Sequence, residues 1–198
     1  MKLYYARYTR AHRPRWLLEE AGAAYELVRI DLRSGGHKQA DYLAVHPHGV
    51  VPALELDDGQ IVYESGAIVM YLADQLGLAP AIASSERGAY CQWVAYCLAT
   101  VEPLIQTYAR HTRFLPEELR SAPTAEDAKG QLRQVWQNLS RALESRTTLL
   151  DAFSAADILL VSMASWAKSF GLIDEQPVIQ RYLQTHTARP AHKRAAAD

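Results

Sequence analysis

Cysteine is the residue type that this sequence uses least. Cys91 and Cys97 are the two cysteines among 198 residues, so residues 1–85 contain none. Their spacing within a predicted helix points the two thiols to different faces, which disfavours a disulfide between them. We expect both side chains to be small, buried apolar groups.

Long apolar runs and an excess of charge are also missing. The run ADILLVSMASWA (156–167) is too short to cross a bilayer, and the N-terminus MKLYYARYTR lacks the apolar core of a secretory signal. The 21 basic and 22 acidic residues give a formal net charge of −1. Nucleic acids and anionic membranes attract strongly basic surfaces, so we expect a cytoplasmic protein that binds neither.

Signatures of phosphate and metal binding are absent as well. No glycine-rich loop has the spacing of a phosphate cradle. His46 and His48 have a ligand-like spacing, but they flank Pro47 in a predicted loop that offers no cysteine or further ligand. We therefore predict no metal site.

The first 77 residues mix short strands with helices. Alternating and apolar segments predict strands at 2–6, 25–31, 52–56 and 60–63. Helical patterns, closed by glycines, predict helices at 14–22 and 65–77 and a short one within 34–49. Asp58-Gly59 suits the turn of a hairpin. The order β-α-β-α-β-β-α predicts a small α/β domain.

The rest of the chain shows helices alone. A linker at 78–85 precedes a long helix at 87–114, with Pro103 as a candidate kink, and helices that open at 124, 154 and 177. Ser154 and Asp157 have the spacing of a capping box, and Phe153 is placed to pack on Ile158. We predict an all-helical domain at 86–198.

The segment GVVPALELDDGQIVYESGAI (49–68) is unusual for a hairpin. Pro52 opens its first strand, where it donates no ladder hydrogen bond. A trans bond would make this an ordinary strand start, whereas a cis bond would leave the Val51 backbone unpaired and open to an extended peptide. The residues alone leave both alternatives open.

Three polar side chains near predicted helix starts could bind the charged groups of a ligand. Ser65 stands at the start of a helix whose N-terminus attracts a carboxylate, although it could simply cap that helix, and Glu64 beside it could hold an amine. Thr9 precedes helix 14–22 and could donate to an anion. A thiol has a pKa of about 8.5, and lowering it by one unit takes about 1.4 kcal/mol, which a hydroxyl and a helix terminus together could supply.

Several segments resemble the glutathione S-transferase superfamily over nearly the whole chain. They are LYYARYTRAHRPRWLLEEAGAAYELVRIDL, HPHGVVPALELDDGQIVYESGAIVMYLAD, YCQWVAYCLATVEPL, FSAADILLVS, GLIDEQPVIQRYL and RPAHKRA. The likeness is to bacterial cytosolic members with a hydroxyl-type active site. It implies a thioredoxin-like glutathione-binding domain at 1–77 and a helical domain at 86–198 that shapes the pocket for the electrophile.

The resemblance also implies roles for individual residues. Thr9 would donate to the glutathione sulfur, and Val51, before a cis Pro52, would pair its backbone with the cysteinyl unit. Glu64 and Ser65 would bind the γ-glutamyl amine and carboxylate.

The same resemblance implies which residues bind the glycyl end of glutathione and which line the electrophile pocket. His37 and Lys38 would reach the glycyl carboxylate. In the second domain the face at 93–111, with Tyr96, Tyr108 and His111, would line the electrophile pocket.

The chain departs from the family pattern in three places. Val50 stands where a lysine is frequent, and His46 where asparagine is common. The loop RYTRAH is rich in positive charge and carries threonine in place of the more frequent serine. Arg10, His12 and Arg13 either compensate for the missing lysine or lie in solvent.

The resemblance implies a detoxifying enzyme that conjugates glutathione, its co-substrate, to small apolar electrophiles, without a metal and as a homodimer. A glutathione-dependent peroxidase or isomerase could use the same thiolate. A thiol-disulfide reductase is disfavoured because residues 1–85 lack cysteine. The remaining alternative is a non-catalytic binding or regulatory relative.

Overall fold

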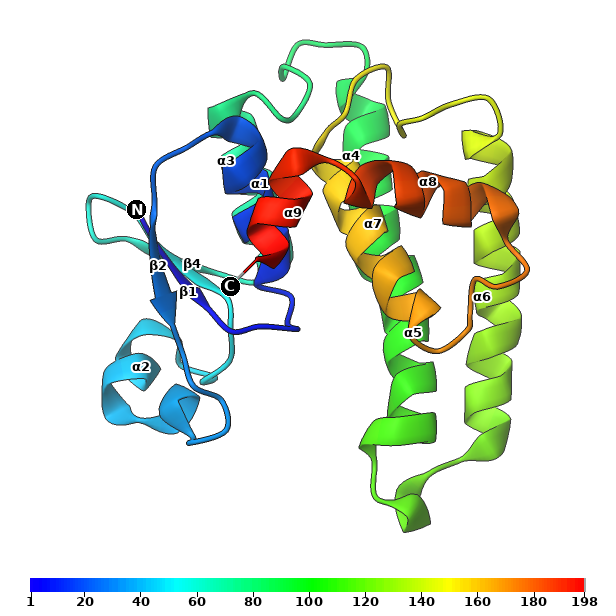
Figure 1. Cartoon of the computed structure of the whole chain (residues 1–198), viewed down its shortest axis with the longest axis horizontal. Coiled ribbons are helices and arrows are strands. Elements are labelled where there is room, and N and C mark those ends of the chain that lie inside the picture. The colour runs from blue at the N-terminus through cyan, green and yellow to red at the C-terminus, as the bar shows by residue number, and fades with distance from the viewer. Residues whose placement is uncertain (198) are drawn as a thin grey trace. The chain divides into compact units, whose positions relative to one another are not determined.

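The computed structural model describes residues 1–197, which form two compact units (Figure 1). One contains residues 1–82 together with the segment from Arg189 onward, and the other contains Ala83–Ala188. The sequence assigned the segment after 188 to the helical domain. It groups with the first unit because its helix packs on the first helix of the chain.

A four-stranded sheet organises the first unit. Its strands are β1 (Lys2–Tyr5), β2 (Glu26–Arg29), β3 (Ala53–Glu55) and β4 (Ile61–Tyr63), in the order β2-β1-β3-β4. β1 and β2 are parallel, and the other pairs are antiparallel. This is the thioredoxin-like arrangement that we predicted. The turn between β3 and β4 contains Gly59 with a φ of 85°, a conformation that favours glycine.

Helices enclose this sheet and supply most of its core. They are α1 (His12–Ala21), α2 (Ala40–Val45), α3 (Ser65–Leu76) and α9 (Pro190–Ala196), with a single 3-10 turn at Gly36–Lys38. α1 lies against both α3 and α9, as Figure 1 also shows for α9. The largest fully buried side chains of this unit are Leu3, Arg13, Trp16, Leu17, Leu18, Leu54, Ile68 and Leu72.

The second unit is all-helical, as predicted. Its helices are α4 (Arg87–Tyr96), α5 (Glu102–Ala109), α6 (Ala122–Leu143), α7 (Ala155–Lys168) and α8 (Pro177–Thr187). A π-helical turn at Cys97–Val101 joins α4 to α5 just before Pro103. α6 begins earlier than expected because the Ser121 side chain caps it, accepting from the Thr124 N–H at 3.3 Å. Among the described residues, no helix is long and apolar enough to cross a membrane.

The predicted capping box is formed at the N-terminus of α7. Asp157 Oδ2 accepts from the backbone N–H of Ser154 at 2.8 Å and from its hydroxyl at 3.2 Å. Asp157 Oδ1 accepts from the Leu149 N–H at 2.8 Å and from the Tyr182 hydroxyl at 2.6 Å. This fully buried carboxylate therefore connects α7 with α8 and with the loop that precedes α7.

One expectation about burial was wrong. Cys97 is buried, but Cys91 is exposed because the outer face of α4 carries it. The exposure of Cys91 could not be assigned before the packing partners of the helix were known.

Candidate functional site

The candidate site begins at one end of the sheet. β3 pairs Ala53 with Tyr4 on one side and with Tyr63 on the other. Val51 lies two residues before β3, Ala6 directly follows β1, and Ser65 lies two residues after β4, so all three lie at this end of the sheet. The Val51–Pro52 bond is cis, as the resemblance implies. Among residues 1–197, neither the N–H nor the carbonyl of Val51 has a hydrogen-bond partner.

Ser65 lies at the N-terminus of α3, against the end of this sheet. It is the first residue of the helix and is 5% exposed, and Glu64 precedes it as the N-cap with a φ of 73°. The simple reading of Ser65 as the helix cap was therefore wrong. Its Oγ accepts a hydrogen bond from Nη1 of Arg13 at 3.2 Å. The hydroxyl proton of Ser65 thus remains available to an acceptor, and the exposed Glu64 lies next to it in the chain.

Arg13 is the site neighbour that the sequence reasoning placed least well. It was expected either near the ligand or in solvent, but it lies in the first turn of α1 and is 2% exposed. Helical spacing carried the signal: Arg13 shares a face of α1 with the buried Trp16 and Leu17. A guanidinium on an apolar face points to a specific polar partner, because a buried charge needs one.

Thr9 lies in the loop between β1 and α1. Its Oγ donates to the Ala6 carbonyl at 2.7 Å and accepts from the Ala11 N–H at 3.2 Å. The hydroxyl therefore anchors the loop beside Ala6, at the end of the sheet where Val51 also lies. To donate to a ligand sulfur, it has to exchange the Ala6 carbonyl for that sulfur.

The loop that carries His37 and Lys38 packs against the segment before Val51. Lys38 Nζ donates to the His48 carbonyl at 3.0 Å. A Cβ on Gly49 would lie 2.5 Å from the His37 carbonyl, so this close approach and the φ of 56° both require glycine. In the part of the chain that the structure describes, Nδ1 of His37 is buried without a partner.

His46 and His12 occupy structural positions. His46 is 1% exposed, and its ring is tilted against that of Tyr63 with centroids 4.7 Å apart. Its Nδ1 accepts from the His48 N–H at 3.3 Å. Burial lowers its pKa. His12 lies between α1 and α9, with its ring 4.9 Å from that of His192. Burial, followed by the His192 charge, lowers the pKa of His12 to about 4, so it neither lies in solvent nor supplies a cation to the site at neutral pH.

The predicted pocket residues of the helical unit make separate contacts. Tyr96 meets Trp93 with ring centroids 5.9 Å apart, and burial raises its pKa. Tyr108 meets Phe170 at 5.9 Å. His111 Nδ1 accepts from the Ser121 N–H at 3.1 Å, at the start of α6. Each of the three therefore has a packing role within its own unit.

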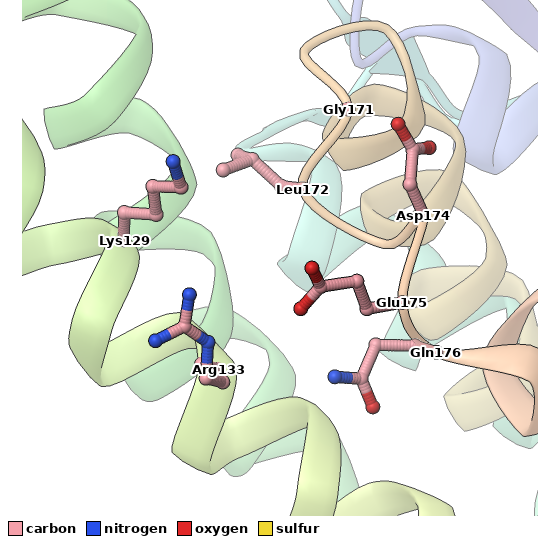
Figure 2. A pocket seen from close by; sticks show the side chains of 7 residues that line it. All are labelled: Lys129, Arg133, Gly171, Leu172, Asp174, Glu175 and Gln176. Carbon is pink, nitrogen blue, oxygen red and sulfur yellow. The ribbon is translucent and has the colours of Figure 1, made fainter.

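A polar cavity of about 230 Å³ lies elsewhere in the helical unit (Figure 2). Its lining residues are Lys129, Arg133, Gly171, Leu172, Asp174, Glu175 and Gln176. Two cations on α6 face a loop that carries two carboxylates, so the cavity is unsuited to an apolar electrophile. None of the predicted pocket residues lines it. Within residues 1–197, no group of three or more histidine, cysteine, aspartate or glutamate side chains could hold a metal ion.

Comparisons with known proteins agree with this geometry. Residues 1–74 match the model of the glutathione S-transferase N-terminal domain. The maleylacetoacetate isomerase of Pseudomonas aeruginosa is 32% identical over 98% of this chain and 95% of its own length. The glutathione S-transferase GstA of Escherichia coli O157:H7 is 31% identical over 96% of this chain and 94% of its own length. A sphingomonad glutathione S-transferase solved with glutathione is 30% identical, with a TM-score of 0.84 over 99% of this chain and 97% of that one. The chain therefore belongs to the glutathione S-transferase family.

Proposed function

We propose that this protein is a glutathione transferase that conjugates the glutathione thiolate to small apolar electrophiles. The observation that carries the proposal is the unpaired backbone of Val51, which lies at the same end of the sheet as the buried hydroxyl of Ser65. An extended peptide can add its own hydrogen bonds to such a backbone. The family relative from a sphingomonad, solved with glutathione, supports the choice of ligand.

In this proposal each end of glutathione meets a different part of the first unit. The γ-glutamyl carboxylate takes the hydroxyl proton of Ser65 at the N-terminus of α3, and Glu64 holds the amine. The cysteinyl unit pairs with Val51, before Pro52. His37, whose buried Nδ1 has no partner in the described chain, and Lys38 face the glycyl carboxylate.

Thr9 acts on the sulfur as a hydrogen-bond donor. Its hydroxyl is far too weak an acid to serve as a base, so it stabilises the thiolate electrostatically and lowers the thiol pKa. The sulfur then attacks an electrophilic carbon, a C–S bond forms, and the leaving group departs with its bonding electrons. The thiol proton has already passed to solvent.

The helical unit, through 93–111 with Tyr96, Tyr108 and His111, would contact the electrophile, and the protein would act as a homodimer in the cytoplasm. An isomerase is the second candidate, because the isomerase from P. aeruginosa matches over nearly the whole chain. Such a reaction would use the same thiolate without consuming it.

Retention on glutathione-agarose and conjugation of 1-chloro-2,4-dinitrobenzene test the proposal. We expect both for the wild type and neither for Ser65→Ala, which removes the donor to the γ-glutamyl carboxylate. A wild-type protein that folds but shows neither property would favour the non-catalytic alternative. Retention without conjugation would favour a binding role or the isomerase.

A further inference from the structure

A buried tyrosine holds the chain directly before Val51. The hydroxyl of Tyr42, in α2, donates to the Val50 carbonyl at 2.7 Å. Tyr42 is 5% exposed, and its ring meets those of Tyr4 and His46 with centroids 5.7 and 6.4 Å apart. Burial raises the pKa of the Tyr42 hydroxyl, which therefore keeps its proton at neutral pH and remains a donor.

The Val50 carbonyl belongs to the same peptide unit as the Val51 N–H. A peptide unit is planar, and in its trans form the carbonyl oxygen and the amide hydrogen point in opposite directions. The Val50–Val51 bond is trans, unlike the bond that follows it. Tyr42 therefore turns the Val51 N–H away from itself, and this N–H has no partner in the part of the protein that the structure describes. A donor on the carbonyl also polarises the unit, which strengthens its N–H as a donor.

The carbonyl of Val51 lies outside the influence of this contact. It belongs to the next peptide unit, whose nitrogen is that of Pro52 and carries no hydrogen. An extended peptide beside a free strand edge accepts from one backbone group and donates to the other. Tyr42 thus acts on one of the two backbone groups that Val51 offers to a ligand, the N–H, and leaves the carbonyl as it is.

We propose that Tyr42 is a positioning residue for glutathione, because it aims the Val51 N–H at the cysteinyl carbonyl of the tripeptide. This inference rests on the proposed glutathione site and adds a residue to it. The cysteinyl N–H of glutathione meets the Val51 carbonyl, which Tyr42 does not hold. Tyr42 acts through the Val50 peptide unit and needs no contact of its own with the ligand.

The variant Tyr42→Phe tests the inference, because it keeps the ring and removes the donor. We expect its dissociation constant for glutathione, measured by titration calorimetry, to rise about threefold to tenfold, as the loss of one aligned neutral hydrogen bond would give. γ-Glutamylcysteamine is the matched ligand. It keeps the γ-glutamyl group, the amide N–H and the thiol, but it lacks the cysteinyl carbonyl and the glycyl unit. Its dissociation constant, measured by displacement of glutathione, should be the same for the variant and the wild type.

Tyr4→Phe is the matched control variant. The Tyr4 hydroxyl donates to Glu55 Oε2 at 2.7 Å, and the Tyr4 ring packs against that of Tyr42. The variant therefore removes a tyrosine hydroxyl from the same aromatic cluster without changing the contact to Val50. It should bind both ligands as the wild type does.

The outcomes separate the two proposals. Unchanged glutathione binding in Tyr42→Phe would overturn this inference and leave the transferase function intact. An equal loss for glutathione and γ-glutamylcysteamine would also overturn it, because Tyr42 would then only support the fold around α2. The same selective loss in Tyr4→Phe would assign the effect to the cluster in general and would overturn it as well. If the wild type bound no glutathione, the proposed function would fail and the inference would fall with it.

Discussion

Arg13 Nη1 donates a hydrogen bond to Ser65 Oγ across 3.2 Å, and both side chains are buried. The two residues lie 52 positions apart and meet because α1 packs on α3. A serine hydroxyl has one proton to donate and lone pairs to accept with. Since the guanidinium can only donate, it occupies a lone pair of Ser65 and leaves the proton for an incoming acceptor. Arg13 is thus a positioning residue for the proposed carboxylate contact.

Replacing Arg13 by glutamine should weaken glutathione binding. We expect a rise of about fivefold to thirtyfold in the dissociation constant, equivalent to about 1–2 kcal/mol, because Ser65 loses the contact that orients its proton. Titration calorimetry measures this change. The effect should not add to that of Ser65→Ala in a double-mutant cycle, since both changes disrupt one contact.

The dipeptide cysteinylglycine is the control for this prediction, because it lacks the γ-glutamyl group. Its KM as a thiol substrate should not change in Arg13→Gln. An equal loss for both thiols would mean that the variant disturbs the unit in general and that Arg13 does not position Ser65.

Changing Thr9 to valine should raise the pKa of glutathione bound to the protein. Valine keeps the shape of threonine but removes the donor, so the thiolate loses about 1 kcal/mol or more of stabilisation and the pKa rises by about one unit. Titrating thiolate absorbance in the ultraviolet follows the shift. Thr9→Ser keeps the donor and should titrate like the wild type.

The structure adds a control to the Thr9 experiment. Thr9 Oγ also anchors the loop through Ala6 and Ala11, so valine could act by loosening the loop. A loosened loop would lower glutathione affinity at every pH, whereas a lost donor shifts the pH profile. An unchanged thiolate titration in Thr9→Val would remove Thr9 from the mechanism.

His12 should make the protein sensitive to mild acid. Its pKa in the folded state is about 4, lowered by burial and then by the charge of His192, with smaller contributions from Arg15 and Arg13 and an opposing hydrogen bond to the Ala195 backbone. In the unfolded chain the pKa is about 6.5. As the pH falls from 6.5 to 4, the unfolded chain takes up a proton that the folded protein does not. The free energy of unfolding therefore decreases across this window, by up to about 3 kcal/mol.

Urea unfolding at several pH values between 7 and 4 measures this effect. His12→Phe should show a flatter dependence of stability on pH because it lacks the titrating group, while it keeps a ring against Trp16 and His192. Equal slopes for the two proteins would assign the acid sensitivity to other groups.

Asp157→Ala should destabilise the helical unit by about 3 kcal/mol. The change leaves the N–H groups of Leu149 and Ser154 and the hydroxyl of Tyr182 buried without their acceptor. Thermal unfolding measures the loss. Asp157→Asn should cost less, because its amide oxygen still accepts hydrogen bonds.

The matched control for Asp157 is Asp151→Ala. The Asp151 side chain is 83% exposed and pairs with Arg146 at the surface, so its removal should change stability by less than about 1 kcal/mol. A similar loss in both variants would show that the buried network adds nothing beyond an ordinary surface pair.

The features that could be predicted from sequence depend on local interactions. Gly22 and Gly77 end helices with φ values of 62° and 72°, which an uninterrupted helical pattern followed by glycine already indicates. The capping box at Ser154 and Asp157 closes within four residues, 154–157. The family pattern around Val51 and Pro52 likewise lies in one continuous segment.

The features that sequence reasoning placed wrongly, or left open, depend on which helix faces which. Arg13 could be assigned to Ser65 only once α1 lay on α3. The segment from 189 onward could be assigned to the first unit only once α9 lay on α1, where Arg189 meets Glu20 at 2.6 and 2.8 Å.

The sequence by itself determined most elements, their order and the helix ends at Gly22, Gly77 and Ser154, because propensity, hydrophobic period and turn chemistry act over a few neighbouring residues. Tertiary structure alone decided which polar groups end up buried together. The partner of a guanidinium or a histidine ring is chosen by packing between segments that can lie more than 160 positions apart, as with Glu20 and Arg189, and no local pattern records that choice.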